Sequence, residues 1–142
     1  MNTIHANRVE DIVQSIIINA PAKSVWTKIS TADGISSWFM PNDFQPIVGH
    51  KFHIQSQFGP SPCEVLEIEE FKKIVFSWDT DGWIVTFSIK DLGDKSEFTV
   101  IHGGWKDYDS IVPKAKTKVS EVYDNMNSGW EGLVNRLAGM LM

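Results

Sequence analysis

Apolar and polar residues alternate along the first two thirds of the chain, and this period is typical of β-strands. Residues 9–19 are rich in β-branched side chains and predict a first strand. Two later turn signals, Asp81-Gly82 and Leu92-Gly93-Asp94, predict tight connections. Because strands joined by tight turns pair antiparallel, the pattern predicts an antiparallel sheet that is mostly a meander. Its other five strands are predicted around Phe52 and Ile54, 63–70, 74–78, 85–89 and 98–102.

Two short helices are predicted after the first strand, because apolar residues there recur three and four positions apart. Their expected limits are about residues 22–30 and 32–39. Pro21 suits the first turn of the first helix, and Pro41 ends the second.

A long helix is predicted at the C-terminal end of the chain. After Gly103-Gly104 and a polar segment, apolar residues recur every three or four positions from Val119 to Leu141, which predicts a helix at about 117–141. Three glycines lie within it, and each costs about 1 kcal/mol relative to alanine. Helix propensity therefore does not explain this helix, and its apolar stripe is expected to pack on the sheet.

This order of elements predicts an α+β fold. In it a curved six-stranded antiparallel sheet wraps around the long C-terminal helix, with two short helices after the first strand. The length suits one core, so we predict a single domain over residues 1–142. A sheet that grips a helix encloses a concave space, which side chains either fill or leave open to a ligand. The six tryptophans and eight phenylalanines are enough for either outcome.

Composition and charge narrow the range of partners. The net charge is −5, and the largest basic group is the three lysines Lys114, Lys116 and Lys118, which we expect to be solvated. Nucleic-acid binding is not expected, because phosphate contacts need a basic surface. Membrane insertion is not expected either, since no apolar stretch approaches the ~18–20 residues of a span. The N-terminus has no export signal and Cys63 has no disulfide partner, so we predict a cytoplasmic protein.

Six short segments, in this order and spacing, resemble one known superfamily. They are Ile16–Ala22 with Val25-Trp26, Ile35–Phe39, Val48-Gly49, Ile74–Trp78, Phe98–Trp105 and Gly129–Leu133. Over about residues 9–141 the chain resembles the START-like (SRPBCC) superfamily of helix-grip proteins, named for the birch-pollen allergen and steroid-transfer domains. More narrowly, it is similar to the activator of heat-shock protein 90 ATPase homologue family.

The resemblance implies the helix-grip fold and a hydrophobic cavity between the sheet and the C-terminal helix. It also offers a heat-shock chaperone as an alternative partner, with a role in stress response. The separate N-terminal domain of such co-chaperones is not expected in this chain, which places that partner second. We expect no cofactor, and a monomer or a homodimer.

His102 is the best single functional candidate. Its alternation with Phe98 and Val100 places it on the apolar face of a strand. There a neutral imidazole could hydrogen-bond a ligand or act as a general base. The commoner alternative is a histidine at a strand end whose nitrogens are satisfied by a backbone carbonyl or by water.

Apolar side chains on the inner faces of the predicted elements are the expected lining of a ligand cavity. The alternative for each of them is a place in an ordinary hydrophobic core. The predicted ligand-binding residues are Trp38, Phe39, Phe52, Ile54, Phe76, Trp78, Val85, Phe87, Phe98, Val100, His102, Met126, Trp130 and Val134.

Other candidate chemistry is weaker. Asp79 and Asp81 are spaced for a cation, but they lie in a predicted hairpin turn. His50 and His53 are expected on opposite faces of a strand, and Cys63 lacks the surroundings of a nucleophile. No metal site is therefore predicted. The sequence also has no phosphate-binding loop, nucleophile elbow or dinucleotide-binding motif.

Three functions stay open on the sequence alone. Non-catalytic binding of a small hydrophobic or amphipathic ligand ranks first, because a cavity is predicted and a catalytic constellation is not. A protein-interaction domain that activates a chaperone ATPase ranks second. A cavity enzyme of the cyclase or hydrolase type ranks third, with His102 as its acid–base group, assisted by Tyr123 or Asp107. We therefore favour a protein that is not an enzyme.

Overall fold

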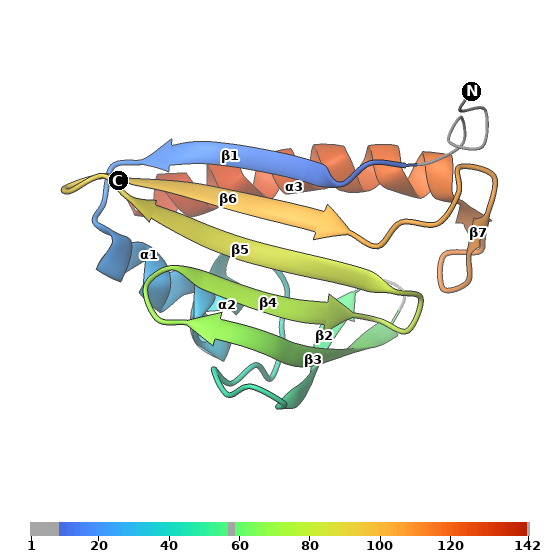
Figure 1. The fold of residues 1–142 in the computed structure, drawn as a ribbon, viewed down its shortest axis with the longest axis horizontal. Coiled ribbons are helices and arrows are strands. Elements are labelled where there is room, and N and C mark those ends of the chain that lie inside the picture. Colours follow the sequence, from blue (N-terminus) through green and yellow to red (C-terminus); the bar gives the residue numbers. More distant parts are fainter. Residues whose placement is uncertain (1–8, 57–58, 142) are drawn as a thin grey trace, which may run out of the picture.

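The computed structural model describes residues 9–56 and 59–141 of the chain. Six strands form one antiparallel sheet in the order β1-β6-β5-β4-β3-β2, and two further short strands form a hairpin (Figure 1). The predicted α+β fold and its meander are confirmed. The elements are β1 (Ile12–Ile18), α1 (Ala22–Ile29), α2 (Ala32–Trp38), β2 (Lys51–Ser56), β3 (Gly59–Glu69), β4 (Lys73–Trp78), β5 (Trp83–Asp91), β6 (Ser96–Gly103), β7 (Ile111–Val112), β8 (Thr117–Lys118) and α3 (Val119–Met140).

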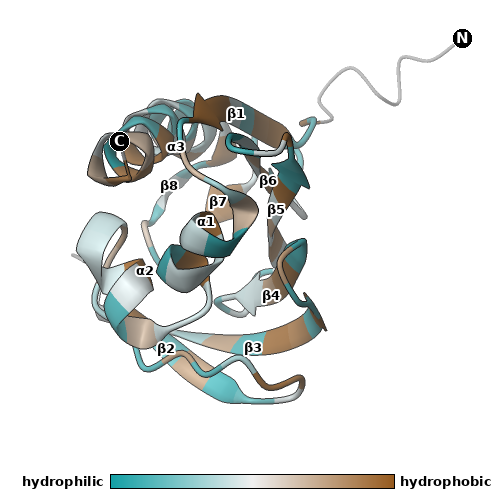
Figure 2. Cartoon of the chain, turned by 90° about the vertical axis from the view of Figure 1, so that its left-hand side faces the viewer, coloured by the Kyte–Doolittle hydropathy of each residue, from teal (hydrophilic) through white to brown (hydrophobic). Residues whose placement is uncertain are grey.

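The sheet is curved, and its three helices lie on the concave side (Figure 2). β1 and β2 are the two edge strands, and α1 and α2 carry the chain from one edge to the other. α3 packs mainly along β1, where the Gln14 side-chain amide donates to Asn127 Oδ1 at 2.8 Å. Trp130 of α3 is 1% exposed, so the helix turns its tryptophan into the core. The predicted helix-grip arrangement is confirmed.

Local sequence explains how the two short helices are placed. Thr31 precedes α2, and its Oγ1 accepts a hydrogen bond from the Gly34 N–H. A Cβ at Gly34 would collide with the Thr27 carbonyl of α1, so the two helices approach closely only because this position is glycine. α2 then ends with Trp38 fully buried against the sheet.

Aromatic rings fill most of the space between the sheet and the helices. Neighbouring ring centroids in this group lie 4.6–6.1 Å apart, and most pairs are edge-on or tilted, as aromatic quadrupoles favour. The middle of the concavity is therefore a packed core. We call the group the aromatic cluster; it consists of Trp38, Phe39, Phe52, Phe76, Trp78, Trp83, Phe87, Phe98, His102, Trp105 and Trp130.

Two elements differ from the sequence prediction in ways that matter for the site. β3 begins at Gly59 instead of residue 63, and this extension pairs with β2 alone. Pro60 and Pro62 lie in the extension, where β4 does not need their missing N–H groups. The polar segment before α3 folds into the β7–β8 hairpin, which the hydrophobic pattern did not predict.

The predicted helices agree with the observed ones to within two residues at each end. In the part of the chain that the structure describes, none of the helices has the length and apolar character needed to span a membrane. The expectation of no export signal falls largely on residues 1–8, which lie outside the described residues.

Candidate functional site

A pocket of about 400 Å³ opens beside the N-terminal half of α3. Its walls come from α3, from the β7–β8 hairpin, from the segment after α2, and from the ends of β2, β3 and β4 with the β4–β5 turn. Its lining is mostly apolar. The lining residues are Phe39, Met40, Ser56, Ser61, Trp78, Asp79, Thr80, Asp81, Trp83, Val112, Pro113, Lys114, Ala115, Val122, Asn125, Met126, Gly129, Trp130 and Leu133.

One face of α3 forms the longest wall of the pocket. Its lining positions, from Val122 to Leu133, are three or four residues apart and therefore share one side of the helix. Gly129 lies in the middle of this face. A Cβ built at Gly129 would meet no heavy atom within 4 Å, so the missing side chain leaves open space there.

Four members of the aromatic cluster form the floor of the pocket: Phe39, Trp78, Trp83 and Trp130. Phe39 stacks on Trp130 with centroids 5.1 Å apart and an interplanar angle of 30°. Trp78 stands nearly perpendicular to Phe39 at 5.7 Å. The floor is therefore made of ring faces and edges held by the packed core behind them.

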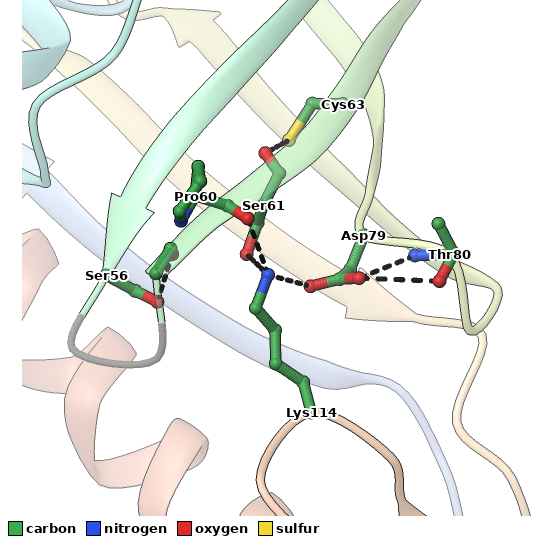
Figure 3. Close-up of polar contacts among 8 residues, drawn as sticks. Ser56, Pro60, Ser61, Cys63, Asp79, Thr80 and Lys114 are labelled. Atoms are coloured by element: carbon green, nitrogen blue, oxygen red, sulfur yellow. Dashed lines mark hydrogen bonds and ion pairs between the residues drawn. The ribbon is translucent and has the colours of Figure 1, made fainter.

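Lys114 lines one side of the pocket and makes polar contacts to Pro60, Ser61 and Asp79 (Figure 3). From the β7–β8 hairpin its ammonium reaches the Pro60 carbonyl at 2.7 Å, Ser61 Oγ at 3.2 Å and Asp79 Oδ2 at 3.1 Å. A lysine has three N–H donors, and these contacts use all of them. The expectation that Lys114 is solvated is wrong, because its side chain is only 26% exposed and joins the hairpin to β3 and β4.

The local conformation of Asp79 lets its carboxylate pair with Lys114. It has a positive φ of 64° at the end of β4, a conformation that aspartate tolerates better than most residues, and its Oδ1 accepts the Thr80 N–H at 2.9 Å. Burial alone would raise the pKa of Asp79, but hydrogen bonds from Lys114 and from the Thr80 N–H outweigh it and lower the pKa. The carboxylate is therefore ionised and pairs with Lys114 at neutral pH. This contact agrees with the expected turn role of the aspartate.

His102 lies behind the floor, enclosed by four tryptophans. Its Nδ1 accepts a hydrogen bond from the Trp130 Nε1–H at 3.0 Å, and the rings of Trp78, Trp83 and Trp105 lie within 5.5 Å. The side chain is fully buried, and burial lowers its pKa to about 3. A neutral imidazole packed in this way holds Trp130 in place. This geometry does not favour a role as an acid–base group.

The predicted ligand-binding residues divide into two groups. Four of them line the pocket: Phe39, Trp78, Met126 and Trp130. The others are buried in the core, as their strand and helix patterns predicted, but they do not line the pocket. They are Trp38, Phe52, Ile54, Phe76, Val85, Phe87, Phe98, Val100, His102 and Val134.

Sequence reasoning missed the residues that close the pocket. Lys114, Val112 and Ala115 come from the unpredicted hairpin, and Gly129 entered the sequence analysis as a cost to the helix and as part of the family resemblance, not as a site residue. The i, i+3, i+4 spacing of α3 could have identified Gly129 as part of the inner face, since it precedes Trp130 and follows Met126 by three positions. No local pattern identifies Lys114, whose partner Asp79 is distant in the sequence.

The remaining candidates lie outside the pocket. Tyr123 is half-buried against Trp105, with centroids 5.2 Å apart, and Asp107 is exposed. Cys63 is buried, and burial raises the pKa of its thiol to about 12, so it is not a nucleophile at neutral pH. Within residues 9–56 and 59–141, no three His, Cys, Asp or Glu side chains are grouped to hold a metal ion.

Replacing Lys114 with methionine keeps the length of the side chain and removes its charge. We expect this change to lower the free energy of unfolding by about 1–3 kcal/mol, because it leaves Asp79 partly buried and without its cation. Urea denaturation measures the change. Lys116→Met, on the exposed side of the same hairpin, is the matched control and should change stability by less than about 0.5 kcal/mol. Equal effects of the two substitutions would contradict the closing role of Lys114.

Replacing His102 with asparagine keeps an acceptor for the Trp130 N–H and removes the imidazole. In the unfolded parent protein, His102 takes up a proton near its ordinary pKa of 6.5. In the folded protein the pKa of His102 is lowered to about 3, so the imidazole stays neutral until the pH falls that far. The free energy of unfolding therefore falls as the pH drops through this range. We expect His102→Asn to make that fall shallower in urea denaturation, with His50→Asn as the control outside the aromatic cluster. A slope equal to that of the parent would refute the buried neutral imidazole.

Comparisons with known proteins identify the family. A family profile described as activator of Hsp90 ATPase homolog 1-like protein matches residues 19–142. Protein BH1534 from Bacillus halodurans is 44% identical, with a TM-score of 0.89 over 96% of this chain and 99% of that chain. MLL2253 from Mesorhizobium loti is 24% identical, with a TM-score of 0.79 over 93% of this chain and 96% of that chain.

The Aha1 dimer from Colwellia psychrerythraea is 15% identical, with a TM-score of 0.76 over 94% of this chain and 96% of that chain, and it shares the fold. No curated protein matches the chain. The family resemblance read from the sequence is confirmed, because the profile spans all but the first strand. The chain belongs to the activator of Hsp90 ATPase homolog 1-like family.

Proposed function

We propose that this protein binds a small hydrophobic or amphipathic molecule, without catalysis, in the pocket beside α3. The observation that carries the proposal is the open, mostly apolar pocket of about 400 Å³ with an aromatic floor. Ligand sites in proteins are typically about 300–1,000 Å³, apolar, and supplied with a few polar groups. Apolar surface exposed to water in such a pocket favours an occupant that buries it.

The distribution of polar groups supports an amphipathic ligand. The floor is apolar and the α3 wall is mostly so, whereas Lys114, Asp79 and the α3 residue Asn125 are polar side chains among the lining residues. An apolar body would pack on the rings of the floor, and a polar group would remain near these side chains. Aromatic faces bind flat molecules well, because they offer a large contact area at little cost in side-chain entropy.

A cavity enzyme receives less support. His102, the sequence candidate for acid–base chemistry, lies behind the floor as a neutral ring whose Nδ1 is engaged by Trp130. Tyr123 and Asp107, its suggested assistants, are not among the residues that line the pocket. An acid–base group must lie within hydrogen-bond distance of the bound substrate. None of these three residues lines the pocket, so none of them meets this requirement.

Filling the pocket from α3 tests the proposal. Gly129→Leu places a side chain into open space on the pocket wall and improves helix propensity by about 0.5–1 kcal/mol. We expect it to weaken binding of an amphipathic aromatic probe, anilinonaphthalene sulfonate, by at least tenfold without loss of stability. Fluorescence titration measures the affinity, and thermal denaturation measures the stability.

Gly132→Leu is the matched control for this test. Gly132 lies on the same helix, also has no heavy atom within 4 Å of a built Cβ, and does not line the pocket. We expect Gly132→Leu to bind the probe as the parent does. Equal affinity of the two variants would place the probe elsewhere and remove the support for this pocket.

A second candidate function is activation of the Hsp90 ATPase through protein interaction. The family description supports it, since it names this activity for the homologue after which the family is called. Addition of the purified chain to Hsp90 should then raise the steady-state rate of ATP hydrolysis several-fold, and Gly129→Leu should stimulate as well as the parent. An unchanged rate at saturating chain would dismiss this function.

Three further expectations stay predictions. They are a single domain over residues 1–142, a cytoplasmic location, and a monomeric or homodimeric state. The relative from Colwellia psychrerythraea was solved as a dimer, which supports testing the dimer first.

A further inference from the structure

Trp78, one of the rings that line the pocket, has a buried indole N–H. Trp78 lines the pocket and is 4% exposed, and its Nε1 has no hydrogen-bond partner among the described residues. Its ring is edge-on to Phe39, Trp83 and Trp130, with centroids 5.4–6.1 Å apart. An unpaired buried donor is costly, and most such donors in folded proteins have a partner. A hydrogen-bond acceptor at this position would therefore be stabilising.

A second unpaired donor lies on a neighbouring ring of the aromatic cluster. His102 Nδ1 accepts from the Trp130 Nε1–H at 3.0 Å, so the neutral ring carries its proton on Nε2. His102 Nε2 also has no partner among the described residues, and its ring centroid lies 5.5 Å from that of Trp78. This part of the aromatic cluster therefore holds an excess of N–H donors over acceptors. The missing chemical group is an acceptor atom.

The charges around the pocket favour a neutral acceptor. The Lys114 ammonium already donates to Pro60, Ser61 and Asp79, and its charge is balanced by the Asp79 carboxylate. The donors of the floor are uncharged, and burying an anion against uncharged groups costs far more than burying a carbonyl. A carboxylate would therefore remain outside the floor, whereas a carbonyl oxygen suits it.

We propose that the ligand is a flat apolar molecule with a neutral carbonyl oxygen, bound with that oxygen accepting the Trp78 Nε1–H. This inference rests on the proposed ligand-binding function and names the chemical class. Nε1 is covered by its neighbours, so the oxygen reaches it after a neighbouring ring moves. Phe39 is suited to this movement, because it is half-buried, follows the end of α2 and lines the same pocket.

Fluorenone and fluorene form the probe pair that tests the proposal, because they share one flat ring system and differ in one carbonyl oxygen. The measured quantity is the ratio of the fluorene Kd to the fluorenone Kd. We expect this ratio to be about tenfold larger for the parent protein than for Trp78→Phe, since phenylalanine keeps an aromatic ring and removes the N–H. Trp26→Phe is the matched control. Trp26 packs on Phe71 away from the pocket lining, and this change should leave the preference unaltered.

The outcomes separate this inference from the function on which it rests. If both probes bind and Trp78→Phe changes their affinities equally, the carbonyl contact is overturned and the apolar pocket stands. If neither probe binds the parent, both proposals fall. A spectroscopic measurement covers the case in which Trp78→Phe does not fold. In the parent, fluorenone must shift the Trp78 indole N–H resonance further than fluorene does, and equal shifts would overturn the contact.

Discussion

The packing of Trp130 into the hollow of the sheet is the interaction on which the rest of the structure depends. The Trp130 ring stacks on Phe39, lies edge-on to Phe87 and donates its indole N–H to His102. Burial of one indole removes about 150–250 Å² from water, which at ~25 cal/mol per Å² stabilises the fold by about 4–6 kcal/mol. Three glycines in α3 cost about 1 kcal/mol each, so this one contact offsets them. The helix therefore depends on packing against the sheet, and Trp130 is the largest side chain that α3 buries there.

The same packing explains why the pocket lies at one end of the grip instead of in its middle. Tryptophan and phenylalanine rings fill the central concavity, where side chains from α2, α3 and the inner strands meet. Beyond them, β3 extends past β4 and the β7–β8 hairpin approaches from the other side. Gly129 contributes no side chain between these walls, and Lys114 joins them through Asp79. The pocket is the space that these four features leave open.

The sequence predicted the fold well because its periods are local properties. The alternation through Phe98 and Val100 and the helical spacing after Val119 each depend on a few neighbouring residues. The site was predicted only in part, because alternation identifies the inner face of a strand but not which inner side chains others cover. Phe76 and Trp78 share this face two residues apart, yet only Trp78 reaches the pocket. Lys114 was expected in solvent because its ion pair depends on a contact distant in the sequence, which no local pattern carries.

If the pocket binds a ligand as we propose, stability and ligand recognition use the same side chains. Trp78 and Trp130 belong to the packed core and also form the floor of the pocket, so their positions are fixed before any ligand arrives. These two indoles therefore lose little side-chain entropy on binding, which leaves more of the contact energy for affinity, whereas Phe39 is the floor ring that moves. The floor also excludes water from the donors behind it, and a hydrogen bond formed there is stronger than one at the surface. The aromatic core therefore sets the shape of the pocket, and in our proposal the few N–H groups that the core leaves unpaired discriminate between ligands.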